Sequence, residues 1–307
     1  MAGITDLPFR RVVRSFGAGL VTSEMVASQE MVQAHAAHRA RAETDGAEGT
    51  SVQIVGRDPR WMGEAARMLR DRGARMLDIN MGCPAKKVTG GQSGSALMRE
   101  PDLARRLIEA VVAAGLPVSV KMRLGWCAET PSAPALARSA ENAGAAMVTV
   151  HGRTRMQFYK GAADWRAVAE TVRAVSIPVI VNGDIADAGA ARRALALSGA
   201  AGVMVGRGAQ GRPWLPGTIA ANLAGSPAPA VPSGAALADL VLGQYDEALL
   251  FYGRELGARV MRKHLGWTLD AAGAPRPLRA AVLTAAEPGA VRALVREALA
   301  GEGAVAA

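Results

Sequence analysis

The stretch Met76-Leu-Asp-Ile-Asn-Met-Gly-Cys-Pro84 joins a short apolar run to a Gly-Cys-Pro turn. The run has the length of a buried β-strand, and the turn places the thiol of Cys83 just beyond the end of that strand. The next segment, 85–95, is basic and rich in glycine, which is typical of a loop that faces a substrate. Cys83 is therefore a candidate for chemistry, and a buried structural cysteine beside a turn is the alternative.

The strand at 76–80 is one of seven similar runs that alternate with amphipathic stretches. We expect the strands at 19–23, 51–55, 76–80, 117–122, 147–151, 178–182 and 202–206. We expect helices between them at 59–72, 101–114, 133–143, 165–175 and 188–198. Several of these helices are followed by the glycine that favours a helix C-terminus. Apolar strands that alternate with helices predict a parallel sheet covered by helices on both faces.

Polar residues lie in or just after the carboxyl half of successive strands. They are Gln53, Asn80, Lys121, His151, Asn182, Asp184 and Arg207. A (β/α)8 TIM barrel assembles its active site in this way, with single residues from many strands on one face. Only seven strands are visible, so we expect the eighth, the first in the barrel, to precede residue 1. A misassigned start is favoured over a true shortening, because a missing strand would expose two unpaired sheet edges.

The last two strands are each followed by a glycine-rich turn. Asn182-Gly-Asp184 follows one strand, and Gly206-Arg-Gly-Ala-Gln-Gly211 follows the next. Backbone N–H groups and a guanidinium at this position of a barrel are typical of a phosphate site. The pair of turns predicts a cofactor that carries a phosphate.

The composition changes after the last strand. A Pro- and Gly-rich stretch at 225–234 indicates a linker, and beyond it helices are expected at 235–252, 257–269, 278–285 and 289–299. We therefore predict a catalytic barrel domain over 1–222, a linker over 223–234 and a small helical domain over 235–307.

Composition narrows the class of protein. The chain has 307 residues, of which 50% are hydrophobic and 21% charged, as expected for a globular protein. Its two cysteines, Cys83 and Cys127, cannot make a disulfide framework and have no partners at metal-ligand spacing. No leader and no apolar stretch of membrane-spanning length is visible. These features predict a cytoplasmic protein without a metal site or membrane segment.

The net charge of +9 lies entirely in residues 1–232, because residues 233–307 contain equal numbers of basic and acidic side chains. A polyanion such as RNA explains this excess, and so does a coding bias toward arginine.

The motifs together resemble the bacterial tRNA-dihydrouridine synthases, closest to the B-type branch. The resemblance rests on Met-Ala-Gly-Ile-Thr-Asp at 1–6, Ser-Glu-Met at 23–25, Val-Gln-Ile at 52–54, Asp-Ile-Asn-Met-Gly-Cys-Pro-Ala-Lys-Lys-Val at 78–88, His-Gly-Arg-Thr-Arg at 151–155, Asn-Gly-Asp-Ile at 182–185, Gly-Arg-Gly-Ala-Gln-Gly-Arg-Pro-Trp at 206–214 and Arg-Lys-His-Leu-Gly-Trp at 262–267. These motifs cover nearly the whole chain in the order of the family.

The resemblance implies an FMN-dependent reduction of the C5–C6 double bond of specific D-loop uridines in tRNA. NADPH, with NADH as the other candidate, would recharge the flavin, and Cys83 matches the family's proton donor. The residues that match cofactor-binding positions are Met1, Ala2, Gln53, Lys121, His151, Asn182, Gly183, Asp184, Gly206 and Arg207. The candidates for contact with the substrate or tRNA are Asn80, Lys86, Lys87, Arg153, Arg155 and Lys160. The position of these basic residues on catalytic-face loops favours RNA over coding bias, and no obligate protein partner is expected.

Two other functions stay open. One is a small-molecule FMN oxidoreductase on the same barrel, and the other is a non-catalytic RNA-binding protein that kept the fold. In the helical domain, Arg262, Lys263 and His264 could contact tRNA, although a solvated helix face explains them nearly as well.

Overall fold

The computed structural model describes residues 1–33 and 49–300, and these form two compact units. The first unit comprises Met1–Leu7 and Gly19–Gly206, and the second comprises Pro8–Ala18 and Arg207–Ala307. The grouping of 8–18 with the C-terminal helices is not one that the sequence predicted. The functional division into catalytic, linker and tRNA-binding segments stays a prediction.

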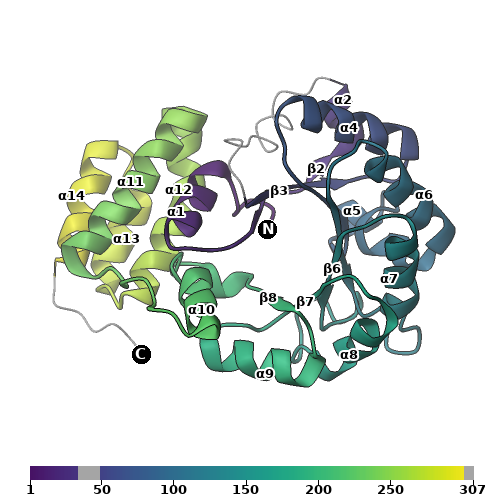
Figure 1. The fold of residues 1–307 in the computed structure, drawn as a ribbon. Helices are drawn as coiled ribbons and strands as arrows, with labels where there is room; N and C mark the ends of the chain where they lie inside the picture. The colour runs from purple at the N-terminus through teal and green to yellow at the C-terminus, as the bar shows by residue number, and fades with distance from the viewer. Residues whose placement is uncertain (34–48, 301–307) are drawn as a thin grey trace. The chain divides into compact units, whose positions relative to one another are not determined.

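The first unit is built on a parallel sheet (Figure 1). Its strands are β1 (Val21–Thr22), β2 (Val26–Ala27), β3 (Thr50–Val55), β4 (Leu77–Met81), β5 (Val118–Arg123), β6 (Met147–His151), β7 (Val179–Asn182) and β8 (Gly202–Met204). The order in the sheet is β1-β3-β4-β5-β6-β7-β8, and β2 also pairs with β3. This order and the helices between the strands confirm the predicted (β/α)8 barrel type of fold, followed by a helical C-terminal region.

The first predicted strand, 19–23, corresponds to the short strand β1, and a second short strand, β2, lies beyond its predicted end. β1 pairs with the start of β3, whereas β2 pairs with its end. Between them the hydroxyl of Ser23 accepts a hydrogen bond from the backbone N–H of Gln53 at 2.9 Å. A side-chain oxygen therefore accepts at a position where a backbone carbonyl would continue the ladder, and the strand is interrupted.

The helices of this unit lie outside the sheet (Figure 1). They are α2 (Ser28–Val32), α4 (Pro59–Asp71), α6 (Pro101–Val112), α7 (Ala133–Asn142), α8 (Trp165–Ala174) and α9 (Ala188–Ser198). The carboxylates of Asp58, Asp164 and Asp187 cap α4, α8 and α9 by accepting a backbone N–H of the first turn. The segment after β4, expected as a loop, contains the short helix α5 (Lys86–Thr89) and a 3-10 helix, η1 (Gly94–Arg99).

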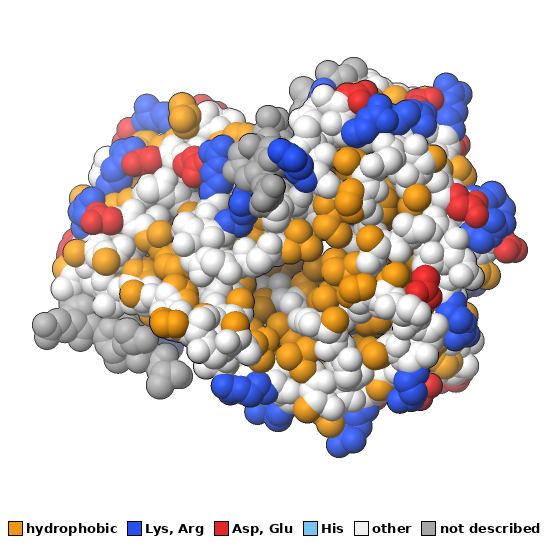
Figure 2. Space-filling view, viewed as in Figure 1, with side chains coloured by type: hydrophobic (Ala, Val, Ile, Leu, Met, Phe, Trp, Pro, Cys, Tyr) orange, Lys and Arg blue, Asp and Glu red, His pale blue; other side chains and the backbone are white. Residues whose placement is uncertain are grey.

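Residues alternate along the strands between an apolar and a polar face. In β5, Val118, Val120 and Met122 are fully buried, and their neighbours Ser119 and Lys121 point to the opposite side. The apolar face lies under the helices and forms the core. In the view of Figure 2, the charged side chains of the first unit lie mainly at its margin, over the outer helices.

The described residues of the second unit form helices and connecting loops, without a strand. It contains α1 (Leu7–Ser15), η2 (Arg207–Ala209), α10 (Leu215–Ala224), α11 (Gly234–Tyr252), α12 (Arg254–Ala271), α13 (Arg276–Thr284) and α14 (Pro288–Leu299). The last four bury a common apolar core, which confirms the four helices predicted from the sequence. Gly217 of α10 lies so close to α1 that a Cβ there would be 1.8 Å from the carbonyl oxygen of Phe16. Only glycine allows this approach.

One residue of this unit corrects the sequence analysis. His264 was expected on a solvated or RNA-contacting helix face, but it is only 3% exposed. Its ring packs between Phe9 of α1, with centroids 5.0 Å apart, and Trp267, at 5.3 Å. His264 is therefore part of the apolar core and cannot contact a polyanion in this arrangement.

No helix among the described residues combines the length and the hydrophobicity that crossing a bilayer requires.

Candidate active site

The polar faces of the strands form one continuous cluster inside the first unit. Strand register places Gln53, Asp78 and Ser119 side by side on β3, β4 and β5. The next row along the strands holds Asn80, Lys121 and Thr149. A third row, at the carboxyl ends, holds Arg123, His151 and Asn182. The sequence-predicted residues Gln53, Asn80, Lys121, His151 and Asn182 are thus brought to one region.

The turn that carries Cys83 is held by the side chain of Asn80. Asn80 Oδ1 accepts hydrogen bonds from the backbone N–H groups of Gly82, at 3.1 Å, and Cys83, at 2.8 Å. Its Nδ2 donates to Gln53 Oε1 at 2.8 Å and lies 3.8 Å from Met25 Sδ. The amide of Asn80 is therefore satisfied by protein groups, and its predicted contact with substrate stays a prediction.

The other side of the turn is fixed as well. The carbonyl of Cys83 accepts from both the backbone N–H of Ser95, at 3.1 Å, and the Ser95 hydroxyl, at 2.9 Å. The Cys83 thiol is not in a disulfide and is partly exposed. A thiol that is held in this way on a partly open turn has the preorganisation that a proton donor would need, and the predicted role of Cys83 stays a prediction.

Lys121 places a cation within this polar cluster. Its Nζ donates to Asn182 Oδ1 at 3.0 Å, and the amide of Asn182 in turn donates to the carbonyl of Met204 at 2.8 Å. Burial of the ammonium lowers the pKa of Lys121 to about 8, and the attraction of Asp78 only partly opposes this effect.

His151 and Asp184 are connected through a buried arginine. Arg153 Nη1 lies 3.3 Å from His151 Nε2. Because a guanidinium can only donate, Nε2 must accept, and the ring proton of neutral His151 is on Nδ1. The same guanidinium donates to both carboxylate oxygens of Asp184, at 2.9 and 2.6 Å.

This arrangement corrects the expectation that Arg153 contacts tRNA from a surface loop. Its side chain is 3% exposed and is fully engaged with protein acceptors. The remaining basic candidates do reach solvent. Lys86, Lys87 and Lys160 are exposed, and Arg155 is partly exposed beside the rings of Trp126 and Phe158.

The other cofactor candidates lie at the N-terminus and in the glycine-rich turns after β7 and β8. Met1 is partly buried, and its sulphur lies 3.9 Å from where a Cβ of Gly206 would be. Ala2 is exposed. Gly183 has a φ of +116° and no room for a side chain, because a Cβ there would be 2.8 Å from His151 Cδ2. Arg207 is exposed at the start of η2, in the second unit, and its contact with a phosphate stays a prediction.

Arg123 is a site residue that the sequence analysis missed. It is 2% exposed, and it donates at 2.8 Å to the carbonyls of Gly82, Thr154 and Phe158. It therefore ties the Cys83 turn to the loop after β6. The signal for it was its position two residues after Lys121, which places both side chains on the same face of β5.

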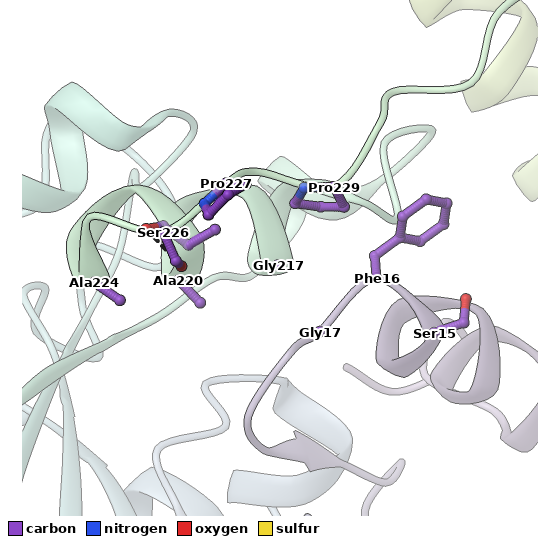
Figure 3. A pocket seen from close by; sticks show the side chains of 10 residues that line it. Ser15, Phe16, Gly17, Gly217, Ala220, Ala224, Ser226, Pro227 and Pro229 are labelled. Carbon is purple, nitrogen blue, oxygen red and sulfur yellow. Dashed lines mark hydrogen bonds between the residues drawn. The ribbon is translucent and has the colours of Figure 1, made fainter.

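A separate pocket lies in the second unit and does not belong to this site (Figure 3). It is lined by Ser15, Phe16 and Gly17 and by small or proline residues within 217–229. None of its lining residues is titratable, so it lacks the acids, bases and cations of the polar cluster.

Comparison with known proteins decides the family. Residues 1–302 match the sequence model of the family described as dihydrouridine synthase. The chain belongs to the dihydrouridine synthase family. The predicted resemblance is thereby confirmed, and the chain is an enzyme of this family.

Named relatives of this dihydrouridine synthase cover nearly all of it. A "probable tRNA-dihydrouridine synthase" of Rhodobacter capsulatus is 60% identical over 97% of this chain and 92% of the relative. A protein of the same name from Rhizobium leguminosarum bv. phaseoli is 48% identical over 97% of this chain and 93% of the relative. The "tRNA-dihydrouridine synthase B" of Xanthomonas axonopodis pv. citri is 43% identical over 97% of this chain and 90% of the relative.

Proposed function

We propose that this chain reduces the C5–C6 double bond of D-loop uridines in tRNA, with FMN as cofactor and NADPH as reductant. One NADPH and one proton are consumed for each dihydrouridine formed, and NADP⁺ is released. One uracil carbon receives a hydride equivalent, and the other receives the proton of the Cys83 thiol. The resulting thiolate regains its proton from water. The observation that carries this proposal is the turn that Asn80 holds, which places Cys83 just beyond the end of β4, where Asn80 pairs with Lys121 of β5.

The polar cluster has a donor set that fits a flavin. Lys121 uses one N–H for Asn182, and Gln53 keeps one N–H and one lone pair beyond its bonds to Asp78 and Asn80. The hydroxyl of Thr149 is buried without a hydrogen-bond partner among the described residues. Such orphaned and partly used groups suit the carbonyl oxygens and ring nitrogens of an isoalloxazine.

We assign the flavin ring to Gln53, Lys121, His151 and Asn182, and the phosphate end to Gly183, Gly206 and Arg207. FMN, when bound there, supplies the hydride. Lys121 would favour the anionic reduced ring by its positive charge. Asp184 contributes indirectly, because its carboxylate is held by Arg153.

The exposed basic residues fit an RNA substrate. Lys86 and Lys87 begin three residues after Cys83 on α5, and Lys160 lies on the loop after β6. Cations beside the reacting thiol can hold phosphates while a flipped uracil enters the cluster. The names of the relatives support tRNA as the substrate, and a tRNA-modifying enzyme would act in the cytoplasm. We assign the C-terminal region 235–307 to tRNA binding as well.

The test measures dihydrouridine in bulk tRNA from a strain that lacks the gene. Complementation with the wild-type chain is expected to restore the modification, and Cys83→Ala is expected to abolish it. Cys127→Ala is the matched control, because Cys127 is the other partly exposed free thiol, and its Sγ lies 3.1 Å from the Thr130 hydroxyl oxygen.

Purified protein separates the remaining alternatives. NADPH-dependent reduction of free uridine without reduction of tRNA would support the small-molecule oxidoreductase. A colourless protein that binds tRNA without turnover would support the non-catalytic alternative. Dihydrouridine formation by Cys83→Ala at the wild-type rate would contradict the role of the thiol.

A further inference from the structure

The polar cluster contains one buried carboxylate that the proposed chemistry does not use. Asp78 on β4 is 2% exposed. One of its oxygens accepts from Gln53 Nε2 and the other from Ser119 Oγ, both at 2.6 Å. Burial raises the pKa of Asp78, whereas these two hydrogen bonds and the charge of Lys121 act in the opposite direction. A carboxylate is costly to bury, so its position calls for an explanation.

The hydrogen bonds run from Asp78 to the backbone of Cys83 without a break. Gln53 donates to Asp78 and accepts from Asn80 Nδ2 at 2.8 Å. Asn80 Oδ1 then accepts from the N–H groups of Gly82 and Cys83. Three side chains thus connect the centre of the sheet to the turn that carries the thiol.

Asp78 determines the order of donors and acceptors along this series of hydrogen bonds. An amide has one donating and one accepting end. Because both oxygens of Asp78 accept, Gln53 must turn its NH₂ toward Asp78 and its oxygen toward Asn80. Asn80 must then turn its NH₂ toward Gln53, which leaves its oxygen for the two backbone N–H groups. If the Asn80 amide were reversed, its NH₂ group would face the N–H donors of the Cys83 turn. If the Gln53 amide were reversed, its NH₂ group would face that of Asn80.

We infer that Asp78 is a positioning residue that fixes the Gly82–Cys83 turn by setting the orientation of the Gln53 and Asn80 amides. It does not touch the reacting atoms. Only the catalytic consequence of this inference rests on the proposed role of Cys83 as the proton donor. The structural consequence, protection of two backbone N–H groups, is independent of that role.

The experiment measures hydrogen exchange of the Gly82 and Cys83 amides in the purified full chain. Asp78→Asn introduces a group that can donate as well as accept, so both amide orientations become possible. We expect exchange at Cys83 to accelerate by about tenfold, the effect of losing one hydrogen bond. Ser119→Ala removes one of the two donors to Asp78 and should produce a smaller acceleration at the same two amides.

Ser51→Ala is the matched control. Ser51 is a fully buried serine on the adjacent strand β3, and among the described residues its hydroxyl has no hydrogen-bond partner. Its replacement should leave exchange at 82–83 unchanged. Equal acceleration by Ser51→Ala and Ser119→Ala would indicate general loosening and would overturn the inference. If Asp78→Asn does not fold, the comparison of these two serine variants decides alone.

Activity provides the second readout. With tRNA as substrate, Asp78→Asn should lower kcat and leave KM nearly unchanged. The thiol is displaced in this variant, whereas the exposed lysines assigned to RNA, Lys86, Lys87 and Lys160, are intact. Unchanged exchange in Asp78→Asn would refute the positioning role whatever the activity. If the wild-type chain makes no dihydrouridine, the proposed function is wrong. Accelerated exchange in Asp78→Asn would then still support the positioning role.

Discussion

Arg153 and Asp184 form a two-pronged ion pair, with Nη1–Oδ1 and Nη2–Oδ2 distances of 2.9 and 2.6 Å. Arg153 lies two residues beyond the His151 end of β6, and Asp184 lies in the turn after β7. The guanidinium also donates to the carbonyls of Lys160 and Gly161. The pair therefore fixes the loop after β6 against the turn that we assign to the cofactor, and Asp184 adopts a φ of +54° to reach it.

Replacing Asp184 by Asn should destabilise the protein by leaving the buried Arg153 without its counter-charge. We expect a loss of about 1–3 kcal/mol, less than for a fully buried pair, because the Asp184 side chain is 34% exposed. Asparagine tolerates the left-handed backbone, so strain does not confuse the result. Urea unfolding provides the measurement.

The matched control is Glu170→Gln, which breaks an exposed pair with Arg173 on α8. Its expected cost is below about 1 kcal/mol. Equal losses for Glu170→Gln and Asp184→Asn would show that the Arg153 pair has no special structural role.

The strands and the site residues at their ends were predictable because short apolar runs and the polar residues at their ends are local signals. Gln53, Asn80, Lys121, His151 and Asn182 were all found in this way and lie together. The interruption after β1 was not predictable, because it depends on one hydroxyl, that of Ser23, which replaces a ladder carbonyl only in the folded sheet.

The buried arginines and His264 were the main errors, for a physical reason. Arginine is rarely fully buried, so Arg153 was assigned to the surface and Arg123 was overlooked. Arg123 donates to the carbonyl of Thr154, and Arg153 donates to the carboxylate of Asp184, each 31 residues away in sequence. Such acceptors depend on tertiary structure. His264 directly follows two basic residues, Arg262 and Lys263, which concealed that it lies on the inner face of α12.

His264 should make the protein sensitive to acid. Burial, and to a smaller extent the charge of Lys263, lowers the pKa of His264 to about 3. Between about pH 6.5 and 3 the unfolded chain therefore binds a proton that the folded chain does not. The contribution of His264 to the free energy of unfolding is therefore fully present above pH 6.5. It is lost as the pH falls through this window, by about 2 kcal/mol at pH 5.

His264→Phe removes this titration while keeping an aromatic ring between Phe9 and Trp267. The free energy of unfolding in urea, measured at pH 7 and pH 5, should fall less in the variant than in the wild type by about 2 kcal/mol. Other titrating groups are shared by both proteins and cancel in the difference. An identical pH dependence for the two proteins would mean that His264 is not held neutral by burial.

Lys121 should make cofactor affinity depend on pH. Because burial lowers its pKa to about 8, most Lys121 side chains carry a charge at pH 7 and few do at pH 9. If the ammonium contacts the flavin as proposed, the affinity for FMN falls as the pH rises through 8. We expect the Kd for FMN, measured by quenching of flavin fluorescence, to increase by about tenfold between pH 7 and 9, the effect of losing one charged hydrogen bond.

Two variants test whether Lys121 is the titrating group. Lys121→Met removes the charge at every pH, so it should bind FMN weakly and without a transition near pH 8. Lys87→Met changes an exposed lysine on α5 and should retain the wild-type transition, since Lys87 is assigned to RNA and not to the flavin. A transition near pH 8 that persists in Lys121→Met would assign the titration to another group and remove Lys121 from the cofactor site.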